Sequence, residues 1–435
     1  MQLYCDPIKV VIKMVVPHCY IYLILPLLWI TSASAVTIFN VNYMPMEDKV
    51  KGRKLSVADI HLGGNVLQSG NYYAELILGE PPKKFIVLID TTSNLLWVNS
   101  ISCKDCPTKS ASRVLSFYDL ENSQTGQLLP CSDVFCKHLS SSTSIPCQKD
   151  HPCIHFEKYG TENLLHGKIV QDFLVLEIVI NHYKTSKVRT KVQFGSISRH
   201  LKSLSSSFTV DGVMGLGPSN TSLVYQLAKS QKWKKMFAHC LDGKRSGGIF
   251  VLGHIVGPKV RKTPLDQTSS RYRTTLLEIT VGETSLSLSA GNVEIKSQNM
   301  TILETGSLIS YLPEKVYQSF LDSIFSDLED ISVINIGGYS CFHYERSIDA
   351  RFPEVVFHFK ELLTLRVYPH EYMFHNMEVF PFRKETMLLL KYALRKYCDV
   401  YCVINCFSLG ALLLSWVFEF RTKESSREGL VHSGR

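Results

Sequence analysis

Clustered charge is scarce in this 435-residue sequence. Only 20% of the residues are charged, and the 47 lysines and arginines, against 39 aspartates and glutamates, are scattered along the chain. Nucleic-acid-binding proteins usually carry a basic stripe interleaved with aromatic residues, or a recognisable module, and the sequence has neither. We therefore expect the net charge of +8 to lie on solvated faces, and we expect no nucleic-acid partner.

The sequence also lacks paired histidines at zinc-finger spacing. This matters because six cysteines lie within 51 residues, some with two, four or five residues between them. Without the histidines we expect no metal and no cofactor, although a redox or metal protein built on these cysteines remains an alternative. The candidates for disulfide bonds are Cys103, Cys106, Cys131, Cys136, Cys147 and Cys153, which allow about 15 connectivities.

The N-terminal segment has no apolar run of the ~20 residues that a membrane span needs. Lys9 and Lys13 precede an apolar stretch over residues 21–30, which ends in Ala33-Ser34-Ala35. A basic start, a short apolar run and small residues are typical of a signal peptide. We expect residues 1–35 to be cleaved, the protein to enter the secretory pathway as an extracellular or membrane-anchored protein, and its cysteines to be oxidised.

Short apolar runs broken by glycine, proline, asparagine and serine dominate the rest of the chain and predict a mostly β fold. Examples are residues 85–89, 172–180, 249–252 and 355–359, whereas residues 222–229 and 313–328 favour helices. We expect a short pro-segment or linker at 36–70, an N-terminal lobe at 71–230, a C-terminal lobe at 231–380 and a divergent tail at 381–435.

Two similar segments stand 214 residues apart. In each, an apolar strand delivers an acid, Asp90 or Glu304, into a turn rich in hydroxyl groups. Acids and serines also favour ordinary turns, so the motif alone is weak. One copy in each lobe of a duplicated fold would explain the separation. The residues that would support the two acids are Thr91, Thr92, Ser93, Thr305, Gly306 and Ser307.

Further motifs follow in a fixed order along the chain. They are Tyr72-Tyr73-Ala74-Glu75, Gly79-Glu80-Pro81-Pro82, Leu96-Trp97-Val98-Asn99, the cysteine insert, Tyr159-Gly160, Asp211-Gly212-Val213-Met214-Gly215, Phe237-Ala238-His239-Cys240, Tyr311-Leu312-Pro313-Glu314 and Phe352-Pro353-Glu354-Val355. Together with the two acid turns they make residues 55–380 resemble the pepsin-like aspartic proteases, specifically the plant branch of nepenthesins and aspartic proteinase-like proteins.

The resemblance implies a bilobal fold with the active-site cleft between two β lobes and with peptides or proteins as substrates. It assigns the catalytic pair to Asp90 and Glu304, which would share one proton and activate a water for peptide hydrolysis at acidic pH. It assigns the flap over the substrate to Tyr159 and Gly160. The resemblance therefore predicts an aspartic endopeptidase.

Several residues depart from the family pattern. Thr92 replaces a glycine, and we expect backbone strain of about 1–3 kcal/mol there. Glu304 replaces an aspartate, which moves the carboxylate by about 1.5 Å. The flap loses a glycine, and Ser100 and Ser196 stand where relatives carry cysteine. These changes predict weak activity, or alternatively a catalytically inactive homologue that binds peptides or regulates a partner.

The end of the sequence departs most from the family. Residues 400–418 form an apolar run whose one strongly polar member is Asn405, and basic residues flank it. We therefore expect an incomplete C-terminal lobe and a candidate membrane span at 400–418, which would anchor the protein. A buried helix or an erroneous gene model are the alternatives. Asn220 and Asn299 match glycosylation acceptors.

Overall fold

The computed structural model describes most of the chain between residues 57 and 375 and two short segments beyond it. The predicted signal peptide, residues 1–35, lies outside the described residues. The predicted pro-segment or linker at 36–70 is wrong at its end, because residues 57–63 are strand β1 of the larger sheet and bury Ala58, Ile60 and Leu62 in its core. The described ranges are 57–64, 72–110, 113–140, 151–159, 163–181, 184–200, 210–241, 247–253, 262–286, 288, 300–306, 310, 312–336, 339–375, 400–403 and 416–419.

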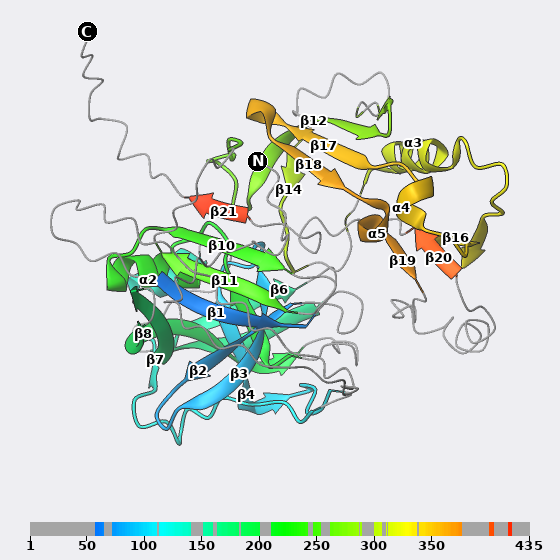
Figure 1. Cartoon of the computed structure of the whole chain (residues 1–435). Helices are drawn as coiled ribbons and strands as arrows, with labels where there is room; N and C mark the ends of the chain where they lie inside the picture. Colours follow the sequence, from blue (N-terminus) through cyan, green and yellow to red (C-terminus); the bar gives the residue numbers. More distant parts are fainter. Residues whose placement is uncertain are drawn as a thin grey trace, which may run out of the picture.

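A 12-stranded sheet forms the larger of the two β bodies in Figure 1. Its path runs β21-β10-β11-β1-β2-β3-β9-β4-β8-β7-β5, and β6 pairs with β7. The strands are β1 (Val57–Gly63), β2 (Tyr73–Leu78), β3 (Lys83–Asp90), β4 (Leu96–Lys104), β5 (Gln127–Leu128), β6 (Ile154–Tyr159), β7 (Asn163–Asn181), β8 (Lys184–His200), β9 (Gly212–Gly215), β10 (Met236–Leu241), β11 (Gly248–Gly253) and β21 (Trp416–Glu419).

The centre of this sheet positions the first acid. β3 is apolar and buried over its second half, and it pairs in parallel with β9, so that Asp90 lies opposite Gly215. β3 pairs on its other side, antiparallel, with β2. Asp90 is therefore the last residue of a strand that neighbours hold on both sides, which fixes the place from which its turn begins.

Two smaller sheets form the second body, drawn from green-yellow to red in Figure 1. One has the order β13-β12-β17-β18, with β14 paired to β12, and the other has the order β15-β16-β20-β19. Their strands are β12 (Arg273–Val281), β13 (Thr284–Leu286), β14 (Met300–Ile302), β15 (Ile334–Ile336), β16 (Tyr339–His343), β17 (Val355–Phe359), β18 (Thr364–Val367), β19 (Met373–His375) and β20 (Val400–Val403).

The helices are few and short, as the sequence predicts. Both predicted helices are present, as α2 (Leu223–Gln231), preceded by Ser222, and α3 (Glu314–Phe325), preceded by Pro313. The structure adds three others that the sequence analysis did not identify: α1 (Val134–Ser140), α4 (Ile348–Arg351) and α5 (Pro369–Tyr372). The mostly β class is confirmed.

Each body has its own apolar core. The larger core packs side chains of β1–β4 and β7–β11 with α2, and it also takes in Tyr272 and Leu303 from the second half of the chain. The smaller core draws only on residues 276–373 and includes one face of α3. Two medium-sized cores agree with a two-lobed chain of this length.

The candidate membrane span at 400–418 is not supported, because both of its ends are strands. Residues 400–403 are strand β20, between β16 and β19, and residues 416–419 are in strand β21, beside β10. The residues between them lie outside the described ranges. In the part of the chain that the structure describes, no helix is long and apolar enough to cross a membrane. An apolar run can fill a buried strand as well as a helix, and its length misled the sequence-based prediction.

Candidate active site

The first acid turn begins where β3 ends. Asp90 is 3% exposed, and three donors from its own turn contact its carboxylate. The backbone N–H and the hydroxyl of Thr92 both donate to Oδ1 at 2.8 Å, and the Ser93 hydroxyl donates to Oδ2 at 2.6 Å. Each carboxylate oxygen therefore has a fixed partner, and the orientation of the Asp90 side chain is set within four residues.

The second acid turn follows β14 and is hydrogen-bonded directly to the first. The Thr91 N–H donates to Thr305 Oγ1 at 3.2 Å, and the Thr305 N–H donates to Thr91 Oγ1 at 3.1 Å. The Thr91 hydroxyl donates to the Leu303 carbonyl at 2.8 Å, and the Thr305 hydroxyl to the Ile89 carbonyl at 2.9 Å. Each bond has its counterpart in the opposite direction, so the two turns are related by an approximate two-fold axis.

Gly306 lies directly against the Asp90 carboxylate. A Cβ atom added to Gly306 would stand 2.7 Å from Asp90 Cγ and 2.8 Å from Oδ1. Carbon atoms pack at about 3.5–4.0 Å, so any side chain at position 306 would displace the carboxylate. The glycine is needed here for close approach.

Thr92 is the counterpart of Gly306 across the two-fold axis. The expected backbone strain is wrong, because the described non-glycine residues with positive φ are Asp105, Lys232, Glu361 and Leu362. The consequence of Thr92 is steric. In the second turn, Gly306 has no Cβ and leaves room for the Asp90 carboxylate. In the first turn, Thr92 stands at the equivalent position and has a Cβ. By the two-fold relation, the carboxylate of an aspartate at position 304 would contact this Cβ.

The other acid, Glu304, is half-buried and has interactions of its own. Its extra methylene places the glutamate carboxylate about 1.5 Å farther from the backbone than an aspartate carboxylate would be. The longer side chain at position 304 and the added Cβ at position 92 therefore offset each other sterically. The two acids lie on turns that are hydrogen-bonded to each other.

The remaining predicted site residues are only partly described. The β6–β7 hairpin places Tyr159 opposite Asn163 in its backbone pairing, but the Tyr159 side chain, Gly160 and Ser307 lie outside the described residues. The flap assignment therefore stays a prediction. Asn220 is exposed at a turn, and Asn299 lies outside the described ranges, so glycosylation also stays a prediction.

Two buried carboxylates near the strands of the site were not identified as structural groups from the sequence. Asp211 accepts from the backbone N–H groups of Ile86 and Ser116, both at 2.7 Å, and pairs with Arg113 at 2.9 Å. Asp211 precedes β9, so these bonds fix the strand that runs beside β3. Its place in the Asp-Gly motif was the available signal.

The second of these carboxylates, Asp172 in β7, is fully buried. The hydroxyls of Ser123, Thr125 and Tyr118 each donate to it at 2.6 Å. Burial alone would raise the pKa of Asp172, but these donors outweigh burial and hold its pKa below the usual value. Burial, assisted by the Asp172 carboxylate, raises the pKa of Tyr118 well above its ordinary range.

The predicted disulfides are confirmed for two pairs. Cys103 is bonded to Cys106, and Cys136 to Cys153. Cys131 is also disulfide-bonded, whereas Cys147 lies outside the described residues. The structure adds a disulfide-bonded cysteine outside the insert, Cys341.

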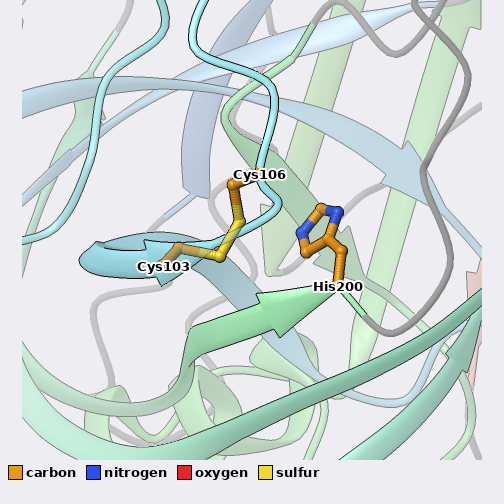
Figure 2. A group of neighbouring side chains, drawn as sticks. All are labelled: Cys103, Cys106 and His200. Carbon is orange, nitrogen blue, oxygen red and sulfur yellow. A yellow bond between two sulfur atoms is a disulfide. The ribbon is translucent and has the colours of Figure 1, made fainter.

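Cys103, Cys106 and His200 form a cluster where β4 and β8 end. These strands pair in parallel, with Lys104 opposite Arg199, so His200 lies beside the disulfide of Cys103 and Cys106 (Figure 2). One ligand-capable atom of each of these three residues lies within 4.8 Å of the others. Burial, weakly opposed by a nearby carboxylate, lowers the pKa of His200 to about 4, so its imidazole is neutral near pH 7.

Comparison with known families covers most of the described chain. The family described as "Xylanase inhibitor N-terminal" matches residues 72–254, and "Xylanase inhibitor C-terminal" matches residues 271–379. Aspartic proteinase 39 of Arabidopsis thaliana is 36% identical over 326 residues, which are 74% of this chain and 68% of the relative. The chain belongs to the plant pepsin-like aspartic proteinase family. Aspartic proteinase 36 of the same plant is 33% identical over 75% of this chain and 68% of its own length.

Solved structures of this family's fold are similar at low sequence identity. The basic 7S globulin from soybean superposes with a TM-score of 0.56 at 18% identity, covering 80% of this chain and 87% of the globulin. Conglutin gamma, a basic 7S globulin from lupine seeds, gives a TM-score of 0.60 at 17% identity over 84% of this chain and 89% of its own. The expected bilobal pepsin-like fold is confirmed.

Proposed function

We propose that this protein is an aspartic endopeptidase of low activity in which Asp90 and Glu304 activate a water. The observation that carries the proposal is the reciprocal hydrogen bonding of Thr91 and Thr305, which sets the two acid-bearing turns against each other. Each of the two turns carries an acid, as a proton-sharing pair requires. Family membership supports the same reaction class.

In the proposed reaction the two carboxyl groups share one proton. The ionised carboxylate removes a proton from water, the water oxygen attacks the peptide carbonyl, and the protonated carboxyl donates to the carbonyl oxygen. Both groups exchange roles as the amine leaves, so no covalent enzyme intermediate forms. The substrate is a peptide or protein, the favourable pH is acidic because one proton must stay on the pair, and we place the protein in the secretory pathway.

The test compares variants of the two altered positions. Asp90→Ala should abolish cleavage of peptides at acidic pH. Glu304→Asp alone should give no gain, because the shortened side chain returns its carboxylate toward the Thr92 Cβ. Thr92→Gly with Glu304→Asp removes both obstacles and should raise the rate by about 100-fold, the usual effect of correcting a misplacement of about 1 Å.

Asp90→Ala in the double-revertant background is the control, since it removes a carboxylate from an otherwise restored site. The proposal is refuted if the folded double revertant neither cleaves peptides nor binds an inhibitor that mimics the transition state of aspartic proteases. A gain from Glu304→Asp alone, equal to that of the double change, would show that Thr92 does not hinder the carboxylate.

A second candidate function is a catalytically silent protein that binds a peptide or a protein. The steric position of Thr92 favours it, and the matching family descriptions name xylanase inhibitors. Under this alternative the parent protein and Asp90→Ala bind a partner equally well and neither cleaves it. A measured difference in cleavage between these two proteins decides for the peptidase.

A further inference from the structure

The ends of β4 and β8 bring together three side chains that all bind soft divalent cations. Cys103 and Cys106 have the two-residue spacing of many structural zinc sites, and β8 adds His200 from nearly 100 residues farther along the chain. Asp105, between the cysteines, has a left-handed φ of 63°, and the chain bends there. Strand pairing and this bend together hold the three groups in one place (Figure 2).

The distances fit one tetrahedral ion. Zinc binds thiolate sulfur at about 2.3 Å, which places two sulfur ligands about 3.8 Å apart around a tetrahedral centre. The cluster's ligand atoms all lie within 4.8 Å of one another, which is close to the spacing of ligands around one ion. Cysteine and histidine are the ligands that zinc prefers.

The polar groups around His200 support a ligand role. His200 is 2% exposed and Asn99 is fully buried, and Nε2 of His200 lies 2.9 Å from Asn99 Oδ1. The same oxygen lies 3.4 Å from Cys106 Sγ. No described protein group lies within hydrogen-bonding distance of His200 Nδ1 or Asn99 Nδ2. A buried imidazole and a buried amide without a protein partner call for a bound ion or water as their partner, and two sulfur atoms lie beside them.

We propose that Cys103, Cys106 and His200 form a redox-gated Zn²⁺ site. In the oxidised protein the disulfide occupies the site. A dithiol reductant exchanges with it, so that the protein gains two thiols and the reductant becomes a disulfide. Zn²⁺ then binds both thiolates with release of two protons, and His200 contributes one ring nitrogen while its other nitrogen keeps the proton.

Selective reduction is expected from the two described disulfides. Cys103 and Cys106 are both partly exposed, whereas Cys136 is 5% and Cys153 0% exposed. The first bond spans a separation of 3 residues and the second a separation of 17, so the first constrains the unfolded chain less. A mild dithiol should therefore open the Cys103–Cys106 bond before the Cys136–Cys153 bond.

The experiment uses the purified protein, treated with a mild dithiol without oxygen and then exchanged into buffer with Zn²⁺. We expect about one zinc per reduced protein and none above background in the oxidised protein. Alkylation followed by mass spectrometry should modify Cys103 and Cys106 after reduction and leave Cys136 and Cys153 intact. Bound zinc should protect the first two from alkylation.

Variants separate a three-ligand site from a simple dithiol. His200→Gln should weaken zinc binding by at least about 100-fold. Losing a group that only hydrogen-bonds a metal ligand already costs up to about 100-fold in metal affinity, and His200 would be a ligand itself. His200→Cys should restore binding. His239→Gln is the matched control, since His239 is also 2% exposed but lies in β10 and should leave zinc binding unchanged.

Parent protein alone gives an independent measurement. Co²⁺ added to the reduced protein should produce the thiolate-to-metal absorption of a tetrahedral site. Equal zinc binding by oxidised and reduced protein overturns the proposal. So does unchanged binding in His200→Gln, or a reduced protein whose Cys103 and Cys106 react with the alkylating reagent as fast with zinc as without it.

Discussion

A single methyl group at Gly306 should disable the site without dismantling the fold. The added Cβ of Gly306→Ala would stand 2.7 Å from Asp90 Cγ, whereas carbon atoms pack at about 3.5–4.0 Å. The carboxylate must therefore retreat by about 1 Å, or the second turn must. Retreat of Asp90 would lengthen its bonds to Thr92 and Ser93, now 2.6–2.8 Å.

The expected loss follows from this displacement. A misplacement of about 1 Å at a catalytic centre costs about 100-fold in rate, and overpacking costs about 1–3 kcal/mol in the free energy of unfolding. The assay measures peptide cleavage at acidic pH in the Thr92→Gly, Glu304→Asp background, together with thermal unfolding and the affinity for a transition-state-mimicking inhibitor. These readouts separate a moved carboxylate from a destabilised protein.

Gly282→Ala is the control. Gly282 is exposed in the turn between β12 and β13 and has a φ of 57°, so alanine there costs about 1–2 kcal/mol of backbone strain without touching Asp90. Gly306→Ala should lose rate and affinity, and Gly282→Ala only stability. The reasoning is refuted if Gly306→Ala keeps the rate and inhibitor affinity of its background within about threefold, since a displaced carboxylate cannot do so.

Three further predictions concern buried groups outside the acid turns. Asp211→Ala should lower the free energy of unfolding by about 3–5 kcal/mol, measured by denaturant titration, because it leaves two backbone donors and an arginine without their buried acceptor. The depressed pKa of Asp172 means that its contribution to stability is present above the unfolded pKa of about 3.9 and is lost as pH falls through the lower, folded pKa. Asp172→Asn should therefore reduce the melting temperature near pH 7 and flatten its decline below about pH 4, and a decline as steep as the parent's would contradict this. Replacing Cys136 and Cys153 by alanine should cost about 3 kcal/mol, because the bond closes a loop across a separation of 17 residues, and an unchanged melting temperature would count against it.

Local patterns were enough to predict much of the fold. The apolar runs at 85–89, 172–180, 249–252 and 355–359 all lie inside strands, because short runs bounded by turn residues have few other ways to be buried. Ser222 and Pro313 correctly marked the starts of two helices, since both residues suit a helix N-terminus. The resemblance located Asp90 and Glu304, and the structure sets their turns together.

What the sequence could not predict depends on distant partners. The steric effect of the Thr92 Cβ cannot be predicted from its own turn, because that Cβ faces the second turn, more than 200 residues away. The same holds for Asp211, whose carboxylate accepts from strand β3 and from the loop at 113–116, two distant parts of the chain. The strands β20 and β21 were missed because their pairing with β16 and β10 decides between strand and helix, and an apolar run alone does not.

The reciprocal hydrogen bonds between Thr91 and Thr305 also determine when the two acid turns can come together during synthesis of the chain. Thr91 and Thr305 bond across 214 residues, so the first acid turn finds its partner only after most of the chain has emerged and the second half has folded. Contacts of such long sequence separation form late, because the loop between them must close first. Until that moment the Asp90 turn lacks its partner acid, and the nascent protein carries an incomplete pair. The order of folding therefore decides when the two acid-bearing turns first meet: only after both halves of the chain have folded.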